Sequence, residues 1–192
     1  MLSARVAGLG TDLLAAQRIS MSALSFSFLP GIGFSLATTT LVGHCIGARK
    51  PGESTGVTRA ATTWAVLWMS AIGAVVLVLA DPIMRLFTQD PQVVRLGSAG
   101  LRVVALLQPA WAVSMVHAGA LRGTGDTRYP LIVSATGTWT AVLLASFGLS
   151  WIGGDLTTVW GAFMFTSPIT ATLLWWRFRR RIEGLVAAES GS

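Results

Sequence analysis

Charged residues are scarce in this chain of 192 residues. Aspartate and glutamate together number 8 and lysine and arginine 14, so that only 11% of the residues carry a charge. Soluble domains carry about 25% charged residues. Hydrophobic residues make up 53% of the chain, and the mean hydropathy is +0.65. This composition excludes a soluble globular domain and predicts an integral membrane protein.

Acidic residues are missing from every long apolar run. Five runs without a charged side chain cover residues 19–48, 60–80, 103–121, 129–154 and 156–176. Transporters that couple to protons or sodium usually use a carboxylate near the membrane midplane, and these runs offer none. His117 is the one deep titratable candidate that remains.

Enzyme and cofactor signatures are also missing. The single cysteine, Cys45, excludes an intramolecular disulfide, and no histidine, cysteine or carboxylate spacing fits a metal site. The segment GTGD at 123–126 lacks the lysine of a phosphate-binding loop, and no nucleophile elbow is present. We therefore expect neither catalysis nor a metal or other cofactor.

The apolar runs themselves predict the fold class. An α-helix needs roughly 20 residues to cross a hydrocarbon core of about 30 Å, whereas a barrel strand needs about ten of alternating polarity. We predict an all-α, polytopic membrane helix bundle with about five transmembrane helices, at residues 12–48, 57–80, 91–121, 127–150 and 156–178. Residues 1–182 form this unit, and 183–192, which are small and polar, are expected to be a disordered cytoplasmic tail.

Prolines mark possible bends and helix starts. Pro30 and Gly31 lie near the middle of the first predicted span, and Pro109 lies inside the third, so all three are hinge candidates. A simple packing kink remains the alternative. Asp90 and Pro91 are typical of a helix start, because the aspartate caps free N–H groups and proline has none to lose.

The basic residues predict the orientation. The sequence pI near 11.3 would suggest nucleic acid for a soluble protein, but five spans place nine lysines and arginines on one side and five on the other. By the positive-inside rule, the C-terminus is cytoplasmic and the protein lies in the cell (inner) membrane, with no nucleic-acid partner. Arg102 is expected to reach the outer interface or to meet a partner within the bundle.

The third span carries the candidate residues for a substrate or ion path: Gln108, Trp111, Ser114 and His117. Gln108 either lines a polar path or satisfies the carbonyl group freed by Pro109. His117 is either a neutral, hydrogen-bonded histidine or a proton relay. The sequence leaves both alternatives open.

A short charged turn separates the third and fourth spans, LRGTGDTRYP at 121–130. Gly123 and Gly125 allow a tight reversal, and Asp126 or Thr127 can cap the following helix. We interpret it as a cytoplasmic loop motif whose members are Arg122, Gly123, Gly125, Asp126, Thr127 and Arg128.

Three segments in order, LAAQRI at 14–19, LVGHCIGA at 41–48 and LRGTGDTR at 121–128, resemble the multidrug and toxic compound extrusion (MATE) transporters. The resemblance implies that the five spans correspond to helices eight to twelve of a twelve-helix, two-lobe transporter, without the N-terminal lobe. It also implies export of cationic or amphipathic small molecules in exchange for protons or sodium. The implied partners are the substrate, the coupling ion, the lipid bilayer, and the missing lobe or a second copy of the chain.

One departure from the MATE pattern concerns the coupling ion. Sodium-coupled members carry an acidic residue in the helix that corresponds to the third span, and the region around Trp111 has none. The resemblance therefore favours protons, taken up by a carboxylate of the missing lobe. Two alternatives remain at this point: a flippase for lipid-linked saccharides with the same superfold, and a non-transporting five-helix membrane subunit.

Overall fold

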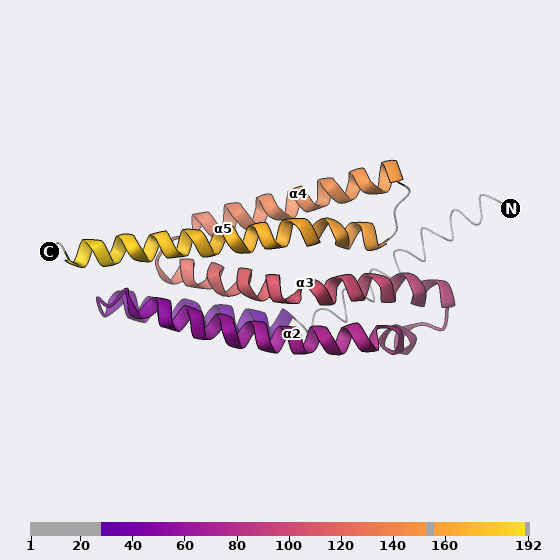
Figure 1. The fold of residues 1–192 in the computed structure, drawn as a ribbon, viewed down its shortest axis with the longest axis horizontal. Helices are drawn as coiled ribbons and strands as arrows, with labels where there is room; N and C mark the ends of the chain where they lie inside the picture. Colours follow the sequence, from indigo (N-terminus) through magenta and orange to yellow (C-terminus); the bar gives the residue numbers. More distant parts are fainter. Residues whose placement is uncertain (1–27, 153–155, 191–192) are drawn as a thin grey trace.

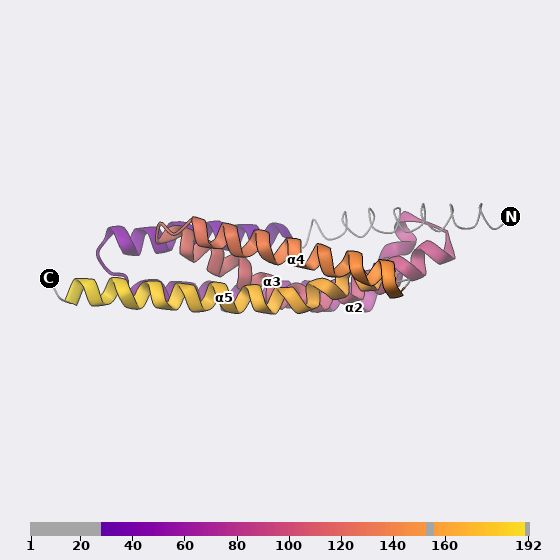
Figure 2. The ribbon, with the colours of Figure 1, turned by 90° about the horizontal axis from the view of Figure 1, so that it is seen from above.

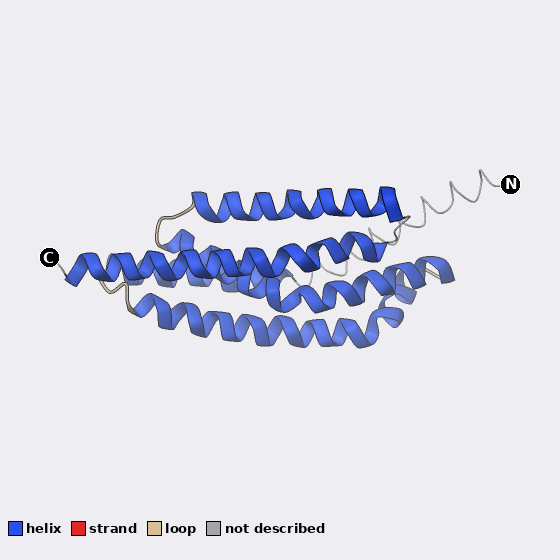
Figure 3. Ribbon diagram, turned by 45° about the horizontal axis from the view of Figure 1, so that its top comes forward, coloured by secondary structure: helices blue, strands red, loops and turns tan. Residues whose placement is uncertain are grey.

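Five helices account for nearly all of the described chain. A computed structural model describes residues 28–152 and 156–190. An N-terminal helix, Phe28–Gly47, is followed by α2 (Glu53–Phe87), α3 (Pro91–Gly123), α4 (Arg128–Ile152) and α5 (Leu156–Ser190). These residues include no strand, and the helices run along one long axis (Figures 1 and 3). The predicted all-α bundle is confirmed.

Four of the helices are long and apolar enough to cross a membrane, namely the N-terminal helix, α2, α3 and α4. The described part of α5 is not among them, although the helix has 35 residues. Its C-terminal half carries Arg177 and three further arginines at 179–181. The chain is thus a multi-pass membrane protein. Among its helices, α5 is distinguished by the cluster of arginines in its C-terminal half.

Helix α3 lies in the middle of the bundle. It packs against α2 on one side and α5 on the other, and α4 packs mainly against α5 (Figure 1). Figure 2 shows that the N-terminal helix and α4 lie on the same side of the molecule, opposite α5. Three groups of buried side chains follow α3 from end to end, around Leu101, Val116 and Leu121. Burial along its whole length makes α3 the element that positions the others.

Helix α2 extends past its expected end at residue 80 and reaches Phe87. Pro82 does not stop the helix but bends it: Leu79 leaves helical geometry, with φ −97° and ψ 15°. The proline ring clashes with the carbonyl group four residues earlier, so the chain kinks there and then continues as a helix. This bend leads into the connection to α3, which Asp90 caps by accepting from the Gln92 N–H at 2.8 Å, as predicted.

The hinge candidates Pro30, Gly31 and Pro109 all lie within helices. Helix α3 continues through Pro109 from Pro91 to Gly123. Pro30 and Gly31 lie in the first turn of the described N-terminal helix. The expected start of the first span at residue 12 lies outside the described residues, and the hinges stay predictions.

The turn after α3 closes through a glycine in left-handed geometry. Gly125 has φ +83°, the Gly125 N–H donates to the Arg122 carbonyl at 3.0 Å, and the Asp126 N–H donates to the Leu121 carbonyl at 3.0 Å. This is a Schellman motif, in which the residue after the helix cap is usually glycine. Of the two glycines expected to make the reversal, only Gly125 does so, since Gly123 is helical.

The segment 183–192 was expected to be disordered, but α5 continues to Ser190. Two features extend the helix. Ile182 is buried and Leu185 packs against the same cluster as Leu121, and Glu183 accepts from Arg179, four residues earlier, at 3.1 Å. Apolar contacts spaced along one face therefore extend the helix beyond the membrane-length segment.

Close helix contact depends on glycines of α3. A Cβ atom added to Gly119 would collide with the Ser35 carbonyl oxygen, and one added to Gly123 would lie 2.7 Å from the Thr39 carbonyl oxygen. The small-residue face that permits this approach is Gly119-x-x-x-Gly123. The similar spacing at Gly43 and Gly47 does not serve this purpose, because Gly47 has open space beside it.

Replacing Gly119 with alanine should lower the melting temperature of the protein in detergent micelles, followed by far-ultraviolet circular dichroism. Alanine in a helix is intrinsically favourable over glycine by up to about 1 kcal/mol, but overpacking against Ser35 costs about 1–3 kcal/mol. Gly33→Ala is the matched control, since this helical glycine has no neighbour within 4 Å. Equal melting temperatures for the two variants would contradict the packing role of Gly119.

Candidate functional site

The four path candidates all lie on α3, but they face three different directions. Gln108 is only 1% exposed and faces α2, where a Cβ added to Gly73 would lie 3.2 Å from its Cγ. Gly73 thus makes room for the glutamine between the two helices. Gln108 belongs to the α2–α3 contact rather than to a cavity.

Trp111, one turn further along α3, contacts different neighbours and joins three helices. Its indole Nε1–H donates to the Ser167 hydroxyl of α5 at 3.1 Å. The ring of Phe28, in the N-terminal helix, lies against it with centroids 4.9 Å apart. A buried indole needs a partner for its N–H, and this bond therefore fixes the plane of the ring.

A cavity of about 280 Å³ opens beside Trp111. Four helices contribute to its wall, and the lining side chains are aromatic or carry a hydroxyl group, except for Met115 and Gly137. The lining residues are Phe28, Trp111, Ser114, Met115, Ser134, Gly137, Thr138, Phe163, Thr166, Ser167 and Thr170. None of the described residues of the wall is charged, so they offer a bound molecule aromatic contacts and hydrogen bonds rather than a counter-ion.

Hydroxyl groups can line this cavity inside a membrane because their own helices satisfy them. The Ser114 hydroxyl donates to the Ala110 carbonyl at 3.0 Å, and the Thr170 hydroxyl donates to the Thr166 carbonyl at 3.0 Å. Each of these oxygens keeps lone pairs that can accept a hydrogen bond. The cavity wall is therefore rich in hydrogen-bond acceptors.

A second cavity of about 540 Å³ adjoins the first and shares Ser114, Met115 and Ser134 with it. It lies against the N-terminal helix and ends at Arg122. The Arg122 guanidinium donates to the Ser35 hydroxyl at 2.9 Å, and this hydroxyl donates to the Met115 carbonyl at 2.6 Å. Arg122 of the loop motif thus lines this cavity and ties the end of α3 to the N-terminal helix.

His117 lies apart from these two cavities. It lines a separate space of about 660 Å³ between α2 and α5. Its Nδ1 lies 2.9 Å from the Val113 carbonyl oxygen, which places a proton on Nδ1, and the Phe178 ring meets its edge at 6.0 Å. The structure brings Trp111 and Ser114 together, and it separates them from Gln108 and His117.

The loop motif is fastened to α5. The Asp126 carboxylate accepts from the Tyr129 N–H at 3.3 Å, which caps α4, and from Arg177 at 3.0 Å. The same guanidinium lies over the Tyr129 ring, 5.0 Å from its centroid. Gly123 packs against the N-terminal helix, while Thr127 and Arg128 are exposed. Asp126 is therefore the residue through which the turn is tied to the last helix.

Five hydroxyl residues of the cavity wall escaped sequence analysis: Ser134, Thr138, Thr166, Ser167 and Thr170. Their spacing was visible, since Ser134 and Thr138 are four apart, as are Thr166 and Thr170. Hydroxyls in α4 and α5 are common elsewhere on these helices, however, and only the packing shows which face the cavity. In the described part of the chain, no group of three histidines, cysteines or carboxylates could hold a metal ion.

A family model described as MatE matches residues 1–147. The chain belongs to the MatE family. The probable multidrug resistance protein NorM of Thermotoga maritima is 34% identical over 138 residues, which cover 72% of this chain and 30% of that protein. The protein of the same name from Rhodopseudomonas palustris is 31% identical over 184 residues, which cover 91% of this chain and 38% of that protein.

The solved structures agree with the MatE assignment. A multidrug resistance MATE family transporter of the MOP superfamily, in an outward-facing conformation, superposes with a TM-score of 0.86 at 20% identity. The match covers 93% of this chain and 40% of that transporter. The chain thus has the fold of one part of a MATE transporter and spans about 30 to 40% of the length of these relatives.

Asp126→Asn should loosen the turn between α3 and α4 in this MatE-family chain. The carboxylate is 13% exposed. Asparagine caps a helix about as well as aspartate, so the variant chiefly loses the charge of the Arg177 pair, which contributes about 1 kcal/mol. The melting temperature in micelles should fall. In the Asp126→Asn background, Arg177→Gln should add little further loss.

The control for this pair is Glu53→Gln, which removes an ion pair with Lys50 whose two side chains are each 62% exposed. We expect a change below about 0.5 kcal/mol there. If Asp126→Asn and Glu53→Gln shift the melting temperature equally, the fastening role of Asp126 is refuted.

Proposed function

We propose that this chain forms one wall of the substrate cavity in a multidrug efflux antiporter. The supporting observation is the uncharged cavity next to Trp111, in which aromatic rings of three helices and hydroxyl oxygens lie together. Aromatic faces attract organic cations, and hydroxyl oxygens accept from their N–H groups. A lipophilic cation that carries its own charge into the site fits this wall.

The names of the relatives support this substrate class, since several are multidrug resistance proteins. The flippase hypothesis requires a broad cationic wall, and no described residue that lines the cavity at Trp111 is charged. Among the described residues that line the adjoining cavity, only Arg122 is charged, and its guanidinium already donates to Ser35. The comparison favours an exporter over a saccharide flippase.

The proposed transporter needs a second lobe. The chain spans about 30 to 40% of the length of these relatives. Many large apolar side chains of the described helices are exposed, among them Trp64, Trp68 and Trp139. Both lipid and a complementary lobe, or a second copy of the chain, can cover such surfaces. Access would then alternate by rocking of the two lobes.

We propose that the protein lies in the inner membrane of the cell. In this orientation the C-terminus is on the cytoplasmic side. Arg180 lies over the Trp176 ring, 3.9 Å from its centroid, and Arg179 over Trp175, 5.8 Å away. An aromatic pair next to arginines is typical of the cytoplasmic membrane interface.

Trp111→Leu should weaken the binding of tetraphenylphosphonium to the purified chain, measured by equilibrium dialysis. Loss of a cation–π contact of about 1 kcal/mol or more predicts at least about a fivefold increase in Kd. Trp111→Phe keeps a ring and should retain most of the affinity. Trp139→Leu is the matched control, because this tryptophan is 69% exposed on α4. If Trp111→Leu and Trp139→Leu bind equally, the cavity is not the binding site.

We propose protons as the coupling ion, because the third span lacks the acidic residue that sodium-coupled members of the family carry there, so that the coupling carboxylate would belong to the second lobe. The chain is to be coexpressed with the N-terminal half of the Thermotoga maritima relative, and export of tetraphenylphosphonium measured in membrane vesicles. Collapse of the pH gradient should stop export, whereas removal of sodium should not. The 192-residue chain expressed alone should give no export. Export that depends on sodium and not on protons would overturn the proposal.

A further inference from the structure

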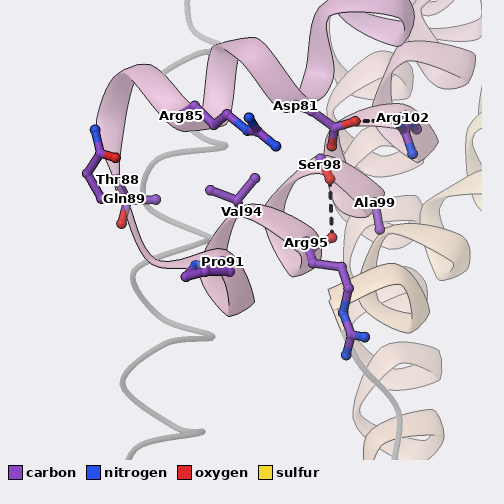
Figure 4. Close-up of a pocket in the computed structure, with 10 residues that line it drawn as sticks. All are labelled: Asp81, Arg85, Thr88, Gln89, Pro91, Val94, Arg95, Ser98, Ala99 and Arg102. Atoms are coloured by element: carbon purple, nitrogen blue, oxygen red, sulfur yellow. Dashed lines mark hydrogen bonds and ion pairs between the residues drawn. The ribbon is translucent and has the colours of Figure 1, made fainter.

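A basic pocket lies at the end of the bundle opposite the C-terminus of α5. It has a volume of about 520 Å³ and is formed where α2 ends and α3 begins (Figure 4). Its lining includes Asp81 and Arg85 from α2, and Arg95, Ser98 and Arg102 from α3. None of the described residues that line this pocket also lines the cavity beside Trp111.

Only one of its three arginines is neutralised. Arg102 donates to the Asp81 carboxylate at 2.7 Å, and Figure 4 shows this pair with Arg85 on the other side of Asp81. Arg85 and Arg95 make no ion pair within the described part of the chain. The nearby Asp90 carboxylate already accepts from the Gln92 N–H at the start of α3. The three arginines and one aspartate among the described lining residues therefore leave an excess of two positive charges.

The other polar groups of the pocket suit an oxyanion. The Thr88 hydroxyl oxygen accepts from the Asp90 N–H at 3.2 Å, so its hydrogen remains available for donation. The Ser98 hydroxyl donates to the Arg95 carbonyl at 3.2 Å and so holds the first turns of α3 at the pocket floor. Guanidinium groups bind phosphate with paired hydrogen bonds, and a neighbouring hydroxyl adds a further donor.

The position of the pocket indicates where the phosphate comes from. The α2–α3 connection follows a membrane-length helix and precedes another, so it lies at the surface of the bilayer. Leu86 and Phe87, directly after Arg85, are 84% and 55% exposed. Exposed apolar side chains next to unpaired arginines match the chemistry of a phospholipid, which has acyl chains beside a phosphate group. We propose that this pocket binds the phosphate of an anionic phospholipid headgroup.

The proposal is tested with the whole chain purified in dodecyl maltoside, by native mass spectrometry with added phosphatidylglycerol or phosphatidylcholine. The test variant is Arg85→Gln/Arg95→Gln, which leaves the Arg102–Asp81 pair in place. At about 1 kcal/mol for each arginine, phosphatidylglycerol should bind about 30-fold more weakly, and phosphatidylcholine binding should change little. Circular dichroism first checks that the variant keeps its helix content.

The matched control is Arg49→Gln/Arg181→Gln, which removes the same charge from two exposed arginines toward the other end of the bundle. It should change phosphatidylglycerol binding less than about threefold. A parallel titration with inorganic phosphate separates the two sources of the anion. If the test variant loses phosphate binding but keeps phosphatidylglycerol binding, the pocket serves a soluble anion and the lipid assignment is overturned. Equal losses in both variants, or none in either, would overturn the site itself.

Discussion

Close approach of helix backbones at glycine is the interaction on which this structure depends. Membrane helices gain little from apolar burial against one another, because lipid is as apolar as a leucine side chain, so close contact must supply the attraction. Gly73 brings α2 onto α3, Gly119 and Gly123 bring α3 onto the N-terminal helix, and Gly137 brings α4 onto Thr170 of α5. Each contact sets the distance at which side chains on either side of it meet. Gly137, at one of these contacts, also lines the cavity beside Trp111.

Polar groups inside the bundle are arranged so that few of them need water. Serine and threonine hydroxyls of α3 and α5 donate to carbonyl groups of their own helices, which lets these two helices present oxygen atoms to a cavity with their donors satisfied. Charge is kept to the ends. At one end Asp126 and Arg177 hold the α3–α4 turn against α5, and at the other Arg102 pairs with Asp81 and leaves two arginines over. The charged groups of these pairs thus lie toward the two ends of the bundle.

Local features of the sequence predicted local structure well. Asp90 caps α3 and Asp126 caps α4 as expected, because a cap depends on only a few consecutive residues. Features that depend on neighbours were harder to predict. Pro82 was expected beyond the end of its helix, and the chain bends through it. The tail after residue 182 was expected to be disordered, and contacts of Ile182 and Leu185 extend α5 instead.

The sequence by itself determined that the chain is a bundle of membrane helices, because uncharged runs of 19 to 30 residues in lipid have no other way to satisfy their backbone groups. Its three motifs also pointed to the family. Only the tertiary structure decided which residues share a site. Gln108, Trp111, Ser114 and His117 follow one another on a single helix, yet helical rotation and three different neighbours direct them to α2, to the hydroxyl cavity and to the space beside Phe178. Spacing along one helix fixes the direction of a side chain, but not which helix it will meet.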